Sequence, residues 1–226
     1  MAFGHFGNPL GHFFDPVLFT AELLFTVAAV IFCFAIYYKT RESYELTKYE
    51  GIKYFRDAFL FFGLSYVTRF LFSLLLLSRV AFDIILLQNI FVPLFILPLG
   101  YFSTIAISYL IFSLIWKRYK NKYLIVFGHG VAVLLPLVSF LTRSHAILLV
   151  LQSLLLVTAV ILALLMHKEG KKVTQVRILY FLVLALWLIN LWMIGPRRLF
   201  TVKISSQVIS LIVFVTLYQK IAKWVK

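Results

Sequence analysis

Three ionisable residues stand far apart in the sequence, each inside a stretch that is otherwise strongly apolar: Glu22, Arg69 and Lys203. A charge near the centre of a bilayer costs at least about 2.5 to 3.5 kcal/mol, so each such residue calls for a physical explanation. One acid beside two bases leaves an excess of positive charge, which suits an anionic or carboxylate ligand. The alternative is an ion pair that fixes the register of the helices, with Lys203 extending outward along its aliphatic stem.

Four other residues lie at a similar depth and could line the same cavity. Tyr66 precedes Arg69 by three residues and so shares its helical face. Gln207 follows Lys203 by one turn, and Asn190 and Trp187 lie near the end of one apolar stretch. Tryptophan near a membrane boundary is often an interface anchor, which leaves the role of Trp187 open. The predicted ligand-binding residues are therefore Glu22, Tyr66, Arg69, Trp187, Asn190, Lys203 and Gln207.

The composition indicates what surrounds these residues. Hydrophobic residues make up 63% of the 226-residue chain and charged residues 13%, with a mean hydropathy of +1.00. A soluble domain is about half apolar and about a quarter charged. So few charges cannot cover a surface that faces water. The sequence predicts an all-α integral protein of the cell membrane, built as a single transmembrane domain over residues 1–226 with no soluble domain.

Seven apolar stretches are long enough to cross a bilayer, because a helix rises about 1.5 Å per residue and the hydrocarbon core is about 30 Å thick. The predicted spans cover residues 16–38, 54–78, 89–116, 123–141, 144–166, 177–194 and 199–218, with a polar loop at 39–53. Apolar residues within this loop lie close to helical spacing, so an interfacial amphipathic turn or helix is the alternative there: Tyr44, Leu46, Tyr49 and Ile52. The stretch from Val80 to Trp116 could hold one long helix bent at Pro93 and Pro98, or two short spans.

The distribution of basic residues favours seven spans. Lys and Arg accumulate in short cytoplasmic loops. With seven spans one side receives Arg79, Arg143, Arg197 and Arg198. The other side receives Lys39, Arg41, Lys48, Lys53, Arg56, Lys117, Arg118, Lys120, Lys122, Lys168, Lys171, Lys172, Arg177, Lys220, Lys223 and Lys226. This segregation predicts a seven-transmembrane-helix bundle with the N-terminus outside and the C-terminus in the cytoplasm.

The topology predicts where the three buried charges lie. Counted from the outer ends of their spans, Glu22, Arg69 and Lys203 are about 9, 13 and 6 Å deep at the helical rise, so all three fall in the outer half. If the helices form a ring in sequence order, the first span contacts both the second and the seventh. Glu22 would then lie between Arg69 and Lys203.

The remaining motifs give little sign of an enzyme. The chain has no HExxH, CxxC, P-loop or dinucleotide-binding glycine pattern, so we predict no catalytic residue, metal or cofactor. His129, Gln152 and Cys33 are interpreted as packing or hydrogen-bonding residues between helices. The basic loops are expected to attract anionic lipid headgroups. No loop is long enough for a nucleic-acid-binding module, so nucleic acid is excluded as a partner.

In its seven helices and its predicted orientation the chain resembles heptahelical sensory proteins such as rhodopsins and membrane receptors. Lys203 in the last span invites comparison with the lysine of retinal proteins. In that family the lysine lies near mid-membrane, opposite an acid on the third helix. Here Lys203 lies near the outer end of its span, and the third span contains no acid. The resemblance therefore concerns architecture and not a retinal site.

Three functions follow as hypotheses. The first is a receptor-like or sensory protein whose outward-facing polar cavity binds a small anionic ligand and whose basic inner loops contact a cytoplasmic or membrane protein. The second is a transporter or channel for a small solute, and an oligomer is compatible with it. The third is a non-catalytic subunit of a larger membrane complex.

Overall fold

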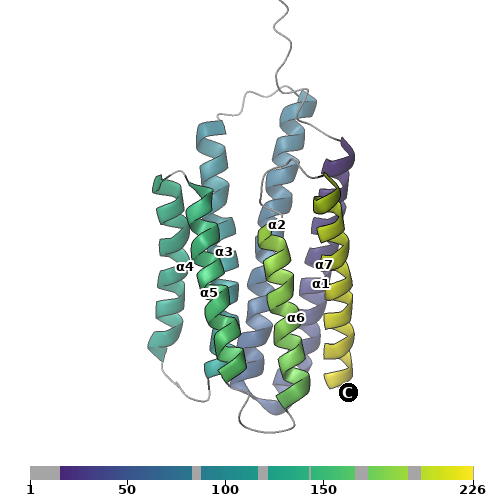
Figure 1. Cartoon of the computed structure of the whole chain (residues 1–226), viewed down its shortest axis with the longest axis vertical. Coiled ribbons are helices and arrows are strands. Elements are labelled where there is room, and N and C mark those ends of the chain that lie inside the picture. Colours follow the sequence, from purple (N-terminus) through teal and green to yellow (C-terminus); the bar gives the residue numbers. More distant parts are fainter. Residues whose placement is uncertain are drawn as a thin grey trace, which may run out of the picture.

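The chain is a bundle of helices. The computed structural model describes residues 16–82, 88–116, 122–142, 144–165, 173–192 and 200–225, and these residues form no strand. Within these ranges there are seven helices: α1 (Pro16–Thr47), α2 (Glu50–Phe82), α3 (Gln88–Ile115), α4 (Lys122–Thr142), α5 (His145–Leu165), α6 (Val173–Trp192) and α7 (Phe200–Val225). Figure 1 shows them side by side, running alternately up and down, with the C-terminus at the end where α1 meets α2.

The helices close into a ring in sequence order. Each one packs against the next, and α7 returns to pack against α1. Helix α3 also contacts α5, and every residue from Ser103 to Leu110 on it is buried. The predicted ring is therefore present, and it places α1 between α2 and α7.

The outer surface of the bundle is apolar. Leu24, Ile31, Val126, Phe127 and Leu165 are among many large hydrophobic side chains that are exposed. Six of the described helices are long and apolar enough to cross a membrane. The described apolar part of α6 is shorter and covers Tyr180–Ile189. Lipid contact explains an exposed apolar surface of this extent, so the chain is an integral multi-pass membrane protein.

The structure decides between one long helix and two short spans in the stretch from Val80 to Trp116. Helix α2 continues to Phe82, and a single helix, α3, covers Gln88–Ile115. The alternative of two short spans in this region is therefore wrong. The bends expected at Pro93 and Pro98 stay a prediction.

The polar loop expected at residues 39–53 is largely helical. Helix α1 continues through it to Thr47, and α2 begins at Glu50. The first helix ends where Lys48 adopts a φ of 51° and its amide donates to the Tyr44 carbonyl at 2.7 Å. A left-handed residue after the last turn is a common helix end. Polar composition predicted a loop here, but acid–base pairs within each helix let the helices extend beyond their apolar parts.

Candidate functional site

The three buried charges meet at one point of the bundle. Arg69 Nη2 donates to Glu22 Oε1 at 2.5 Å, and Lys203 Nζ donates to Glu22 Oε2 at 2.7 Å. Each oxygen of one carboxylate therefore holds a different base, from a different helix. We call these residues the ion triad. The contact inferred from helix depth and ring closure is present, whereas a ligand at this point stays a prediction.

Helix packing positions the ion triad. Because α1 packs against both α2 and α7, a residue on its inner face can reach both neighbours. The triad is partly enclosed, with 22% of the Glu22 side chain and 18% of the Arg69 and Lys203 side chains exposed. The formal charges sum to one positive charge. Charges shielded from water to this degree interact more strongly than surface pairs, so the unbalanced charge is felt by any anion that reaches it.

Aromatic residues lie between the same helices. Tyr66 is 3% exposed and Trp187 4% exposed. The Phe62 ring contacts both, with its centroid 5.0 Å from Tyr66 and 4.4 Å from Trp187. Phe214 on α7 completes the group, 6.2 Å from Phe62 and 6.4 Å from Tyr66. We call Phe62, Tyr66, Trp187 and Phe214 the aromatic floor. Trp187 is thus a core residue and not an interface anchor.

Gln207 lies on the inner face of α7, one turn beyond Lys203, and is 4% exposed. Its Nε2 atom is buried and has no hydrogen-bond partner among the residues that the structure describes, and the same holds for the hydroxyl of Ser210 one turn further on. A buried donor without a partner costs about 1 to 3 kcal/mol. Sequence analysis missed Ser210, although its spacing from Lys203 and Gln207 on one helical face was a usable signal. The Asn190 side chain lies outside the part of α6 whose side chains are described.

Other buried polar groups in the bundle do have partners. Gln152 on α5 donates to the hydroxyls of Ser103 at 2.6 Å and Thr104 at 3.1 Å on α3. The Ser113 and Tyr180 hydroxyls are 2.8 Å apart and join α3 to α6. The prediction that Gln152 forms hydrogen bonds between helices is confirmed. These pairs show how the protein satisfies a polar group whose only task is to hold two helices together.

A second polar cluster joins α3 to α4. The His129 ring lies 2.9 Å from the Tyr101 hydroxyl through Nδ1 and 3.4 Å from the Tyr109 hydroxyl through Nε2. A neutral imidazole has one donor and one acceptor nitrogen, so two hydroxyls can satisfy it. The interpretation of His129 as a packing residue is confirmed. Its two tyrosine partners were missed: the eight-residue spacing of Tyr101 and Tyr109 places them on one face of α3, but it does not show which neighbouring helix that face contacts.

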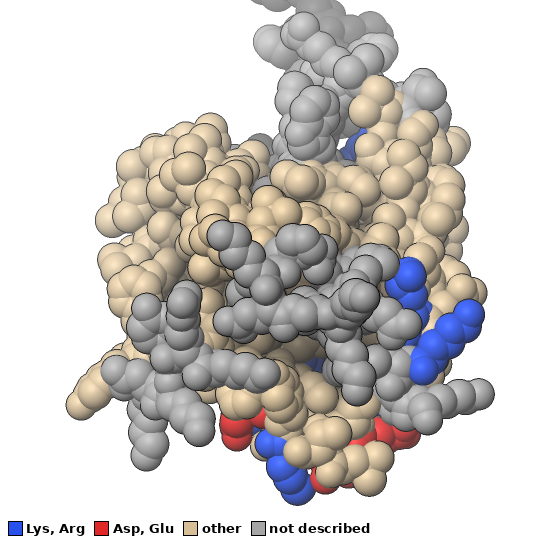
Figure 2. All heavy atoms as spheres, turned by 60° about the horizontal axis from the view of Figure 1, so that its bottom comes forward, with Lys and Arg blue, Asp and Glu red and all other residues tan. Residues whose placement is uncertain are grey.

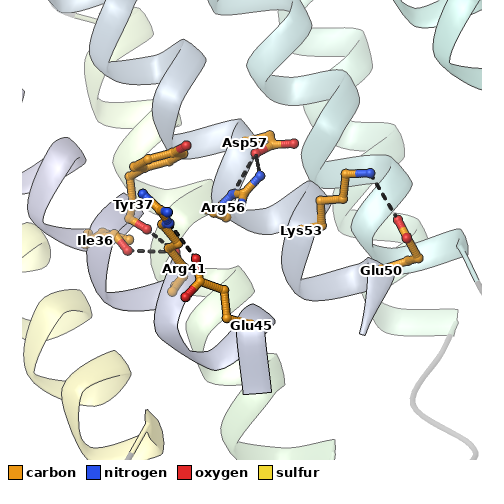
Figure 3. A network of polar contacts seen from close by, with 9 residues as sticks. Ile36, Tyr37, Arg41, Glu45, Glu50, Lys53, Arg56 and Asp57 are labelled. Carbon is orange, nitrogen blue, oxygen red and sulfur yellow. Dashed lines mark hydrogen bonds and ion pairs between the residues drawn. The ribbon is translucent and has the colours of Figure 1, made fainter. Parts of the chain in front are cut away.

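The opposite end of the bundle carries a different arrangement of charge. In the hairpin formed by α1 and α2, acids and bases pair locally. Figure 3 shows three of these pairs: Arg41 with Glu45, Lys53 with Glu50, and Arg56 with Asp57. The fourth pair is Lys39 with Glu42. We call these eight residues the hairpin pairs. Figure 2 shows red and blue side chains together at this end of the molecule, below sides that are mostly tan. Each acid of the hairpin pairs has its own base, so the formal charges of these eight residues cancel.

The charged groups of the ion triad can bind a charged ligand, but they offer no obvious group for covalent chemistry. A carboxylate held by two bases is a poor general base. The described residues include no group of three or more His, Cys, Asp or Glu that could hold a metal ion. Cys33 is buried on α1. What the arrangement of the ion triad offers chemically is recognition of charge.

Comparison with known proteins identifies one informative relative. An uncharacterized protein of Archaeoglobus fulgidus is 33% identical over 179 residues, which cover 76% of this chain and 78% of that protein. The chain belongs to the same family as this archaeal protein. No family model matches the chain, and no solved structure matches it. The description of this relative names no activity, so the ion triad is the basis for a functional proposal.

Proposed function

We propose that the protein is a receptor-like, seven-span membrane protein that binds a small anion at the ion triad, with this end of the bundle facing outside. The observation that carries the proposal is the single carboxylate of Glu22 shared by Arg69 and Lys203. A monoanion at this point neutralises the remaining positive charge. Arg69 supports this reading, because a guanidinium has five donors and the contact with Glu22 engages one of its nitrogens.

The orientation is supported by the basic residues. The bases of the hairpin and of the C-terminal end of α7 lie at the end opposite the ion triad. The predicted topology assigns further bases, which are outside the described residues, to the same side: Lys117, Arg118, Lys120, Lys168, Lys171 and Lys172. The positive-inside rule then assigns that end to the cytoplasm. Exposed bases such as Lys220 and Lys223 would meet anionic headgroups or a cytoplasmic partner there.

Calorimetric titration of the purified protein in lipid nanodiscs tests the binding site. We expect acetate and propionate to bind, and the uncharged analogues acetamide and propionamide not to bind. Arg69→Gln should weaken acetate binding by about tenfold or more, the effect of losing one charge-assisted hydrogen bond. Lys220→Gln, the same loss of a base at an exposed position on α7, is the matched control and should leave binding unchanged.

Chemical rescue covers the case in which Arg69→Gln does not fold. Glu22→Ala removes the shared carboxylate, and added acetate should then raise the unfolding midpoint of this variant more than that of the natural protein. Acetamide should have no such effect. If acetate does not bind the natural protein, the ion triad is only a structural clamp and the proposal is wrong, even where acetate rescues Glu22→Ala by replacing the lost carboxylate.

A flux measurement separates a receptor from a transporter. Radiolabelled acetate should not enter liposomes that contain the natural protein faster than it enters protein-free liposomes. Rapid uptake that Arg69→Gln abolishes and Lys220→Gln preserves would instead assign the same site to a transporter.

A further inference from the structure

The inner face of α7 is polar along its first part and apolar along the rest. Its residues follow an alternating four- and three-residue spacing: Lys203, Gln207, Ser210, Phe214, Leu217 and Ile221. From Gln207 onward all are buried. We call Lys203, Gln207 and Ser210 the polar stripe. It begins at the ion triad and ends at Phe214, which belongs to the aromatic floor.

Two members of the polar stripe lack the partners that similar residues have elsewhere in this protein. The buried Gln152 donates to two hydroxyls, whereas Gln207 Nε2 has no partner. On α7 itself, the Ser206 hydroxyl donates to the Val202 carbonyl at 2.7 Å. The buried Ser210 hydroxyl makes no such bond.

This difference is informative because a helical serine normally has a carbonyl one turn earlier within reach. Thr216, further along α7, uses it and donates to the Ile212 carbonyl at 2.8 Å. Gln207 and Ser210 are thus two neighbouring buried polar groups without a described hydrogen-bond partner, on the same helix face as Lys203 of the ion triad. A ligand that extends inward from the ion triad would satisfy them.

We infer that Gln207 and Ser210 form an inner subsite of the ion triad, which receives an uncharged oxygen of the same ligand. This inference rests on the proposed anion site. The ligand class is then an elongated monocarboxylate with a hydroxyl or carbonyl group some distance from its carboxylate. Gln207 lies four residues and Ser210 seven residues beyond Lys203, which is about 6 and 10 Å along the helix.

The hydrogen-bonding chemistry of Gln207 and Ser210 determines which second functional group the ligand should carry. The unpartnered atom of Gln207 is a nitrogen, which only donates, and a serine hydroxyl donates or accepts. An acceptor oxygen satisfies both. A second charged group is disfavoured, because neither Gln207 nor Ser210 can neutralise it and the aromatic floor beyond them is apolar.

Matched ligands test the inference on the full-length protein in nanodiscs. Hexanoate has a carboxylate alone, and 5-oxohexanoate and 6-hydroxyhexanoate add one neutral oxygen at the far end. We expect the oxygenated ligands to bind the natural protein about tenfold more tightly than hexanoate, the gain from satisfying a buried donor. Gln207→Leu should abolish this preference, and Ser210→Ala should reduce it.

Gln152→Leu is the matched control, because it changes a buried glutamine that already has partners, and the preference should survive it. The unfolding midpoint without ligand provides a second measurement. Since Gln207 Nε2 has no partner to lose, Gln207→Leu should not lower the midpoint.

The outcomes separate the two proposals. Equal binding of hexanoate and its oxygenated analogues by the natural protein overturns the inner subsite and leaves the anion site intact. A preference that Gln207→Leu does not change, or a midpoint that this variant lowers, also overturns it, the latter because the amide would then have a partner in the resting protein. If none of the carboxylates binds, the anion site itself is wrong.

Discussion

The two ends of the bundle use charge in opposite ways. At one end the hairpin pairs join residues no more than four positions apart, and three of the four pairs have side chains that are 30% to 62% exposed. The fourth, Arg56 with Asp57, is as enclosed as the ion triad but joins adjacent residues of one helix. At the other end the ion triad joins Glu22 to Arg69 and Lys203, 47 and 181 residues away, and each side chain is mostly enclosed. The first arrangement is balanced and local, and the second is unbalanced and joins three helices.

The comparison shows why the same residue types have different roles. Exposed pairs within one helix contribute little, since water competes with them and salt screens them. An enclosed pair is costly to form, but removing one partner leaves a charge without compensation. We therefore expect the ion triad to tolerate few substitutions and the three exposed hairpin pairs to tolerate many.

Charge reversal is the most severe way to break this contrast. Glu22→Arg places three bases together, so its loss of unfolding free energy should exceed the roughly 3 to 5 kcal/mol seen when one partner of a buried pair is removed. Arg69→Glu alone should also destabilise the protein. The double variant restores an acid–base pair, and its unfolding midpoint in an SDS titration should recover a large part of the loss. A double variant no better than either single one would show that the two side chains do not interact.

Neutralisation at each end gives a direct comparison with a smaller effect. Glu22→Gln should lower the free energy of unfolding by about 3 kcal/mol, because both bases lose their counter-charge. Glu45→Gln removes an acid of the hairpin pairs and should produce no resolvable change. The same SDS titration measures both. Equal losses at the two positions would remove the distinction between the two ends.

The smallest expected effect concerns the backbone of the hairpin and not its charges. Lys48 adopts a φ of 51°, a conformation that costs a side-chain-bearing residue about 1 kcal/mol relative to glycine. Lys48→Gly should therefore raise the free energy of unfolding by about that amount, despite losing a base. Lys53→Gly, inside α2, is the control and should lower it. A loss of stability in Lys48→Gly would show that the charge matters more than the turn.

Much of the fold was predictable from particular residues. The scarcity of charge required lipid as the surrounding medium, and the segregated Lys and Arg residues argued for one helix, not two, between Val80 and Trp116. That helix is α3. The hairpin differs from the loop predicted at 39–53 and agrees with the alternative of a helix there, since α1 continues to Thr47 and α2 begins at Glu50. A polar stretch whose acids and bases alternate at helical spacing can continue a helix, and Lys48 marks where it stops.

The sequence by itself determined that Glu22, Arg69 and Lys203 lie inside apolar stretches at similar depth, where a lone charge is costly, and it predicted their contact on the condition that the helices form a ring in sequence order. Only the tertiary structure decided which polar groups stay unsatisfied. Gln152 and Gln207 look alike as buried glutamines in apolar helices, yet Gln152 Nε2 donates to two hydroxyls on α3, whereas Gln207 Nε2 has no partner in the described part of the chain. A hydrogen bond depends on what the neighbouring helix presents at the same height and rotation, and spacing along one chain does not contain that information.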